Sequence, residues 1–242
     1  MKRFLVALTL TSFAVSAFAQ MRGGPSTGIN ARMLKMFGDT KAFSANAEAR
    51  ILDKDQKEVT TMPMTMALRD GKLRSEMDVS QVKGSGMPPE AAAMMKQAGM
   101  DKMVTLVRPD KKATIISYPG LQSYAEVPFS EDEAAEEKVE STEVGKEPID
   151  GHPCVKTKFT STDSKGTTRE AFVWQATDLK KFPLQMQMVQ RSQTLIVKFQ
   201  PPKFETPDAA LFDMPAGYTK YPSVQALMQA AMMKMFGGAG AK

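Results

Sequence analysis

Three chemically distinctive residues each occur once in this chain, and all three fall within residues 145–174. His152, Cys154 and Trp174 are the only histidine, cysteine and tryptophan of the 242-residue sequence. His152 and Cys154 are two positions apart, so on a β-strand both side chains would face the same side. An imidazole and a thiolate side by side are ligands that suit zinc or copper. The pair is therefore the first candidate for a metal site.

The rest of the sequence offers little to complete such a site. No second histidine or cysteine exists to fill a tetrahedron around the metal. Copper(I) could instead recruit thioethers from one of two groups, Met62, Met64 and Met66 or Met232, Met233 and Met235. The competing interpretation is structural, with His152 capping a turn and Cys154 acting as a small buried hydrophobic residue. We favour that interpretation and predict no metal and no cofactor, with copper handling as a minor alternative.

Enzymatic chemistry is disfavoured for similar reasons. Neighbouring side chains on one strand seldom give the geometry that nucleophilic attack requires, and no residue is identifiable to orient His152 beside Cys154. The sequence contains no glycine-rich phosphate loop or dinucleotide fingerprint in a suitable context. Glu147 and Asp150 could pair as acid and base, but turns select aspartate for its backbone bonding alone. We predict that the protein is not an enzyme.

The first nineteen residues have the form of a signal peptide. Lys2 and Arg3 precede an apolar run over residues 4–15, and Ala17-Phe18-Ala19 fits the cleavage pattern. The mature chain is then expected to be periplasmic or secreted. No cysteine directly follows the predicted cleavage point, so lipid attachment is not expected. No later stretch is long and apolar enough to predict a membrane-spanning helix.

The charge balance argues against nucleic acid as a partner. The chain has 32 basic and 27 acidic side chains and a formal net charge of +5. That composition indicates a mixed surface, whereas nucleic-acid binding requires a concentrated positive field.

After residue 40 the apolar residues follow the period of two that is typical of half-buried strands. Residues 43–51 show this alternation clearly, and Asp70-Gly71 predicts a hairpin. The predicted strands are 43–51, 58–68, 73–79, 102–108, 112–118, 121–127, 139–147, 153–162, 168–176, 184–191 and 194–200. Helices are predicted at 32–37, 88–98 and 222–236.

These elements predict an α+β fold that is mostly β. We expect a curved antiparallel sheet, or open half-barrel, of about nine to eleven strands covered by two or three helices. The expected division is a signal peptide (1–19), a flexible N-terminal segment (20–40), a β domain (41–222), and a C-terminal amphipathic helix with a flexible tail (223–242).

The twenty methionines are the most unusual feature of the composition. Flexible thioether side chains fill irregular gaps and suit adaptable binding surfaces. We predict that methionines of the strands face methionines of the helices across a cavity, with ordinary core packing as the competing interpretation. The predicted lining consists of Met62, Met64, Met66, Leu68, Met94, Met95, Trp174, Met186, Met188, Leu227, Met228 and Met232.

Several short phrases resemble an uncharacterised family of secreted bacterial proteins, which is itself similar to the lipoprotein-carrier fold of LolA and LolB. The phrases are Phe43-Ser44-Ala45, Arg74-x-Glu76, Pro109-Asp110-Lys111-Lys112, Ser123-Tyr124-Ala125-Glu126, Gly145-Lys146-Glu147, Asp150-Gly151-His152-Pro153-Cys154, Trp174 to Asp178-Leu179, Phe182-Pro183, Leu211-Phe212 and Pro215-Ala216-Gly217-Tyr218. The resemblance implies a curved sheet with a helical lid. The family has no settled activity to transfer to this chain.

The sequence favours a non-enzymatic exported protein that binds a hydrophobic ligand, such as an acyl chain or a lipidated peptide, between the sheet and the Met-rich helices. The alternative is a structural or interaction module of the cell envelope that docks a protein partner and holds no ligand. A continuous apolar pocket would favour the first function, and a fully packed interior would favour the second.

Overall fold

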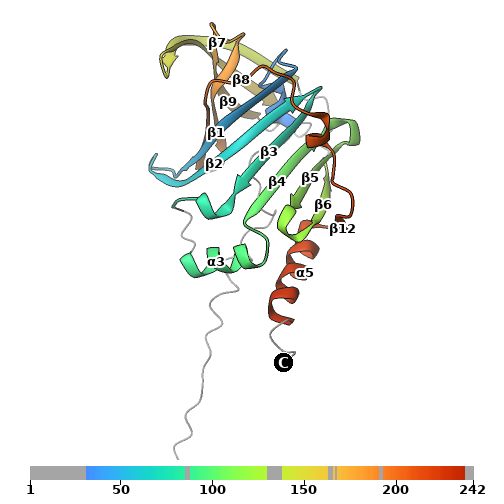
Figure 1. Cartoon of the computed structure of the whole chain (residues 1–242). Coiled ribbons are helices and arrows are strands. Elements are labelled where there is room, and N and C mark those ends of the chain that lie inside the picture. The colour runs from blue at the N-terminus through green and yellow to red at the C-terminus, as the bar shows by residue number, and fades with distance from the viewer. Residues whose placement is uncertain are drawn as a thin grey trace, which may run out of the picture.

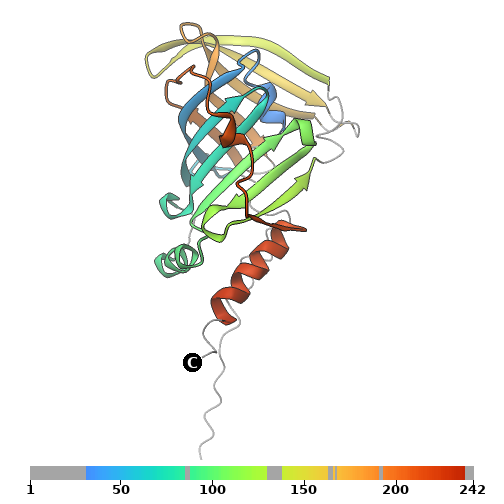
Figure 2. The same ribbon diagram turned by 45° about the vertical axis from the view of Figure 1, so that its right-hand side comes forward.

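The computed structural model of the chain describes residues 31–84, 88–129, 138–162, 166, 168–190 and 193–237. These residues form one twelve-stranded sheet in the order β12-β6-β5-β4-β3-β2-β1-β11-β10-β9-β8-β7. Strands β12 and β6 are parallel, whereas the other neighbouring strands pair antiparallel. The sheet is open, and it curls around the short helix α2 (Figure 1, Figure 2).

The elements follow the predicted pattern closely. The strands are β1 (Ala42–Leu52), β2 (Glu58–Arg69), β3 (Lys72–Asp78), β4 (Lys102–Arg108), β5 (Ala113–Tyr118), β6 (Ser123–Pro128), β7 (Lys138–Ile149), β8 (His152–Thr162), β9 (Thr168–Ala176), β10 (Phe182–Gln190), β11 (Gln193–Phe199) and β12 (Thr219–Tyr221). The α-helices of the described residues are α2 (Ala31–Lys35), α3 (Pro89–Gln97) and α5 (Val224–Gly237).

The predicted fold class is confirmed, with one more strand than the expected range. The additional strand, β12, has three residues and lies between the last predicted strand (194–200) and the last predicted helix (222–236). It exists because Thr219–Tyr221 pairs in parallel with Ser123–Ala125 of β6. A strand that short carries no periodicity, so only the long-range pairing defines it.

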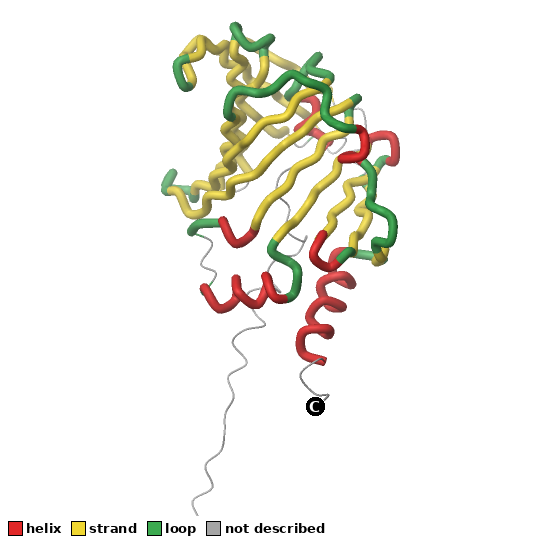
Figure 3. The backbone as a smooth tube through the Cα atoms, in the orientation of Figure 1, coloured by secondary structure: helices red, strands yellow, loops and turns green. Residues whose placement is uncertain are grey.

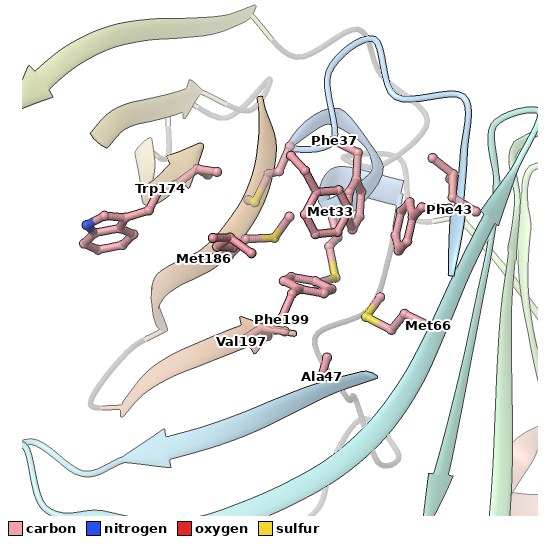
Figure 4. Packing of buried hydrophobic residues seen from close by; sticks show 14 of the residues in the cluster. Met33, Phe37, Phe43, Ala47, Met66, Trp174, Met186, Val197 and Phe199 are labelled. Carbon is pink, nitrogen blue, oxygen red and sulfur yellow. The ribbon is translucent and has the colours of Figure 1, made fainter. Parts of the chain in front are cut away.

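The concave side of the sheet holds the larger hydrophobic core, with α2 at its centre (Figure 4). Phe37, just after α2, lies 4.8 Å from the ring of Phe43 and 5.8 Å from the ring of Phe199, centroid to centroid. Met33, Met36 and Phe37 are all buried, although they belong to the segment expected to be flexible (20–40). In the described part of that segment, burial of these three side chains in the larger core holds the chain against the sheet.

A second core lies at the end of the sheet where α3 and α5 are found (Figure 1, Figure 3). Helix α5 packs against β6 and β12. The loop after α3 approaches the turn Pro119–Leu121 so closely that a Cβ added at Gly120 would lie 2.6 Å from the carbonyl oxygen of Gly99. Because only glycine permits this backbone approach, the two glycines fix the end of α3 beside the sheet.

A connecting segment, residues 200–218, crosses the convex face and is called the strap below. Three arginines on neighbouring strands donate hydrogen bonds to its backbone carbonyls. Arg69 donates to Pro207 at 2.8 Å, Arg74 to Leu211 at 2.8 Å and Arg108 to Phe212 at 2.6 Å. Residues 103–108 are buried on both faces of β4, since the strap covers the convex one.

The Arg108–Asp110 ion pair should make stability depend on acidic pH. Hydrogen bonding from Arg108 lowers the pKa of Asp110 from 3.8 to about 2. Because the folded-state pKa is depressed, the stabilisation is present above about pH 4 and is lost as the pH falls through 2. We expect a contribution on the order of 1 kcal/mol, because the Asp110 side chain is half exposed and solvent screens the pair. Urea unfolding of Asp110→Asn should match the parent chain near pH 2 and fall below it at pH 5.

Candidate functional site

The Met-rich end of the sheet gathers part of the predicted ligand lining. The second core contains the buried methionines Met77, Met100 and Met103. Sequence reasoning missed these three as lining residues, although Met77 stands in the alternating pattern of β3. From the predicted set, this cluster takes Leu227, which is buried, and Met62, Met95 and Met228, which are partly buried.

Other methionines at this end face outwards. Met94 of α3 is 43% exposed, while Met232 and Met233 of α5 are 40% and 71% exposed. Helix α5 has the sequence VQALMQAAMMKMFG, with a single charged residue. An exposed helix surface normally carries many charges, whereas α5 leaves the side chains of Met232 and Met233 exposed. These two residues and Met94 are called the Met-rich patch below.

The remaining predicted lining residues lie in the larger core or on its margin. Met64, Met66, Leu68 and Met186 are buried there, and Met188 packs against it. On β2, Met64 and Met66 belong to the larger core, whereas Met62 packs against both cores. The segment around α2 contributes Met33, Met36 and Phe37 to the larger core, and no local pattern in the sequence predicts this placement.

Trp174 lies on the opposite face of β9 from the helix α2. Figure 4 shows its ring pointing away from Phe37 and Met33. Its indole N–H donates to a carboxylate oxygen of Glu147 at 2.6 Å, and the ammonium of Lys156 lies 4.5 Å from the ring centroid. Lys156 also pairs with Glu147 at 3.2 Å. The hydrogen bond from Trp174 lowers the pKa of Glu147.

His152 and Cys154 are not brought together with further ligands. Nδ1 of His152 lies 2.7 Å from a carboxylate oxygen of Asp178, while the Cys154 thiol donates to the carbonyl of His152 at 3.4 Å. Burial raises the pKa of the Cys154 thiol. Across the described ranges, no group of three or more His, Cys, Asp or Glu side chains is placed to hold a metal ion. The His152–Asp178 contact instead joins the start of β8 to the turn after β9.

Two adjoining hollows lie on the convex face beside the strap, with volumes of about 940 and 430 Å³. Their charged side chains are largely paired, as in Lys198 with Asp150 at 2.7 Å and Arg74 with Glu76. Asn46 donates to Gln200 at 3.1 Å across the boundary between them. These hollows combine residues far apart in sequence, so no sequence motif could indicate them.

A third hollow, of about 540 Å³, lies where the loop after α2 meets the turn after β9 and the strap. Its wall includes Lys41, Lys180 and Lys181, together with Phe37, whose side chain is buried, and the partly buried Phe204. The hollow is thus both cationic and aromatic. Like the other two hollows, it was not predicted from the sequence.

None of the helices in the described part of the chain is long and apolar enough to cross a membrane.

Comparison with solved structures finds general likenesses of shape. Lipoprotein LppX of Mycobacterium tuberculosis has a TM-score of 0.38 at 11% identity, covering 71% of this chain and 93% of that one. A LolA superfamily protein of Nitrosomonas europaea has a TM-score of 0.37 at 8% identity, covering 76% of this chain and 98% of that one. The MucA/MucB complex of Pseudomonas aeruginosa contains a chain with a TM-score of 0.38 at 13% identity, covering 77% of this chain and 61% of that one. Such values carry no conclusion about ligands.

Sequence comparison gives a family. No curated protein matches the chain. The family model described as "Domain of unknown function (DUF4412)" matches residues 52–195, which run from the end of β1 into β11 and make up more than half of the chain. The chain therefore belongs to the DUF4412 family.

Proposed function

We propose that the protein binds an apolar ligand, such as an acyl chain or the lipid part of a lipidated peptide, at its Met-rich end. The observation that carries the proposal is the grouping of exposed Met94, Met232 and Met233 on two helices beside a core that is itself rich in methionine. We also propose that the protein works as an exported, non-enzymatic binder, with a signal peptide over residues 1–19.

The chemistry of the patch suits a ligand of variable shape. Thioether side chains have three rotatable bonds and repack easily around different apolar groups. Each methylene that the patch removes from water contributes about 0.8 kcal/mol. Helix α5 packs against β6 and β12, and the Met233 side chain beyond these contacts is largely exposed. A ligand seated there gains contacts without opening the larger core around α2.

A charge placed on the patch should weaken binding. We expect Met233→Glu to reduce the affinity for the neutral fluorescent probe N-phenyl-1-naphthylamine about tenfold or more, because an apolar ligand would desolvate the new carboxylate. Met233 is 71% exposed, so the substitution should leave the fold intact. Fluorescence titration measures the affinity, and circular dichroism checks the fold.

Val189→Glu is the matched control. Val189 is 55% exposed and lies on β10, so the same charge is introduced into an exposed apolar site away from α3 and α5. Equal losses of probe binding in both variants would count against a site on α5.

The alternative function is an envelope interaction module without a ligand. The full burial of Leu227 and the close packing of Met77 and Met103 favour this candidate, because that part of the second core is filled. Native mass spectrometry of protein purified from the cell envelope separates the two functions. Bound lipid supports the apolar-ligand proposal. A chain that is always ligand-free and does not bind the probe supports the interaction module.

A further inference from the structure

We infer that the hollow between the loop after α2 and the turn after β9 is a binding site for an amphiphilic organic anion, meaning a carboxylate or phosphate group carried on an apolar body. This site lies apart from the α3 and α5 patch, and the inference does not rest on the proposed function. Its volume of about 540 Å³ falls within the range of about 300–1,000 Å³ that is typical of small-molecule sites.

The charges of the hollow are available for a ligand. Lys41, Lys180 and Lys181 are exposed side chains on its wall, and Asp39 is the carboxylate among the lining residues. Within the described ranges, none of these three lysines forms an ion pair with an acidic side chain, whereas Lys156, Lys158 and Lys198 do. An anion entering the hollow would therefore meet ammonium groups without having to displace an acidic side chain from them.

The backbone supports the inference independently. Lys180 and Lys181 have φ angles of +54° and +60°, so two consecutive lysines occupy the left-handed region. Glycine or asparagine would adopt this conformation at lower cost. Such strain persists only where the surroundings hold it, and it is enriched at ligand sites. The chain keeps two lysine side chains at positions where the turn alone would favour other residues.

Several contacts hold this turn in place. The Lys181 amide donates to the carbonyl of Ala176 at 3.0 Å, and the Thr177 amide donates to the carbonyl of Pro153 at 2.9 Å. The His152–Asp178 contact of 2.7 Å ties the same turn to the start of β8. The single histidine thus acts as a positioning residue that fixes the turn carrying Lys180 and Lys181.

The ring of Phe204, which is partly buried, supplies the apolar part of the site. The ammonium of Lys180 lies 4.8 Å from the centroid of the Phe204 ring, which brings the cation and the aromatic surface together. Phe204 packs edge-on against Phe182 at 6.0 Å, so the ring is anchored to the larger core. A ligand with an anionic group beside an apolar chain or ring matches this arrangement, whereas a free inorganic anion would leave the aromatic surface unused.

The test compares laurate with dodecanol below their aggregation concentrations, using isothermal titration calorimetry on the full mature chain. We expect the parent protein to bind laurate at least tenfold more tightly than dodecanol. The double variant Lys180→Gln, Lys181→Gln should lose at least tenfold in laurate affinity and keep its weak dodecanol binding. Equal binding of laurate and dodecanol by the parent protein would overturn the proposal.

The matched control is Lys111→Gln, Lys112→Gln. This second pair of adjacent lysines is also exposed and also includes a residue with positive φ, Lys112 at +48°. The net charge changes equally in both double variants, so laurate affinity should stay within about twofold of the parent in the control. Equal losses in the two variants would show a general charge effect and would contradict the site. Dependence on Met233 but not on Lys180 and Lys181 would contradict it too, while leaving the apolar-ligand proposal intact.

A second double variant, Lys180→Gly, Lys181→Gly, separates binding from folding. Because glycine relieves the left-handed strain, its thermal midpoint should be no lower than that of the parent, while laurate binding falls as in the glutamine variant. Unchanged laurate binding in this variant would overturn the proposal.

Flotation with phosphatidylglycerol and phosphatidylcholine vesicles then identifies the source of the anion. Co-flotation with phosphatidylglycerol alone, lost in the glutamine variant, indicates a lipid headgroup, and laurate binding without co-flotation indicates a free acid.

Discussion

Replacing Phe37 with alanine is expected to lower the free energy of unfolding by about 3–5 kcal/mol. The side chain is 2% exposed and contacts the rings of Phe43, Phe182 and Phe199 in the centre of the larger core. Its removal leaves a cavity in an aromatic cluster whose members come from three separate strands, so the site has little freedom to collapse. Urea unfolding, followed by circular dichroism, measures the loss.

Lys35→Ala on α2 is the control for this substitution. Lys35 is exposed, and alanine is a good helix former, so the free energy of unfolding should change by less than about 0.5 kcal/mol. If Phe37→Ala were as mild as Lys35→Ala, α2 would not be part of the cooperative core. The result also decides whether the described end of the 20–40 segment belongs to the folded domain in solution.

Replacing Arg108 with methionine is the second large expected effect. Arg108 is 5% exposed, and it donates to the carbonyl of Phe212 at 2.6 Å and to the carboxylates of Asp110 and Asp213 at 2.8 and 3.1 Å. Methionine fills similar space but leaves the Phe212 carbonyl without this donor under the strap. We expect a loss of about 2–3 kcal/mol in the free energy of unfolding. The two carboxylates lose less because both stay partly exposed to water.

The other two strap arginines provide a graded comparison. The side chains of Arg108, Arg74 and Arg69 are 6%, 17% and 32% exposed, and each donates to one strap carbonyl. The loss in free energy of unfolding on substitution with methionine should be largest for Arg108 and smallest for Arg69, because exposed carbonyls regain hydrogen bonds from water. A loss at Arg69 equal to that at Arg108 would contradict the view that burial sets the strength of these contacts.

The strap and α2 lie on opposite faces of the sheet, and this has a consequence for function. With α2 in part of the concave space and the strap over part of the convex face, the two proposed binding surfaces lie at the ends of the strands. The Met-rich patch lies at the end carrying α3 and α5. The cationic hollow lies among the loop after α2, the turn after β9 and the strap. The two proposals can therefore be tested separately, by variants that share no residue.

The sequence by itself determined the strands and most of the turns. Alternation in β1 and the Asp70-Gly71 turn are local signals, because side chains of a half-buried strand face core and water in turn. Strand β4 spans 102–108 and β9 spans 168–176, as predicted. The last helix, predicted over 222–236, is present as α5 over Val224–Gly237. Each of these features depends on residues within a few positions of one another.

Only the tertiary structure decided which surfaces these elements cover. Periodicity shows that one face of β2 is apolar, but it does not show that α2 fills part of the concave space and that Met64 is therefore core. It marks Trp174 as apolar without choosing the side of β9 on which the ring lies. The cationic hollow needs Lys41, Lys180 and Phe204 from three distant segments. Contacts at such separations depend on how the sheet curls and where the connections cross it, and single-strand patterns carry no information about either.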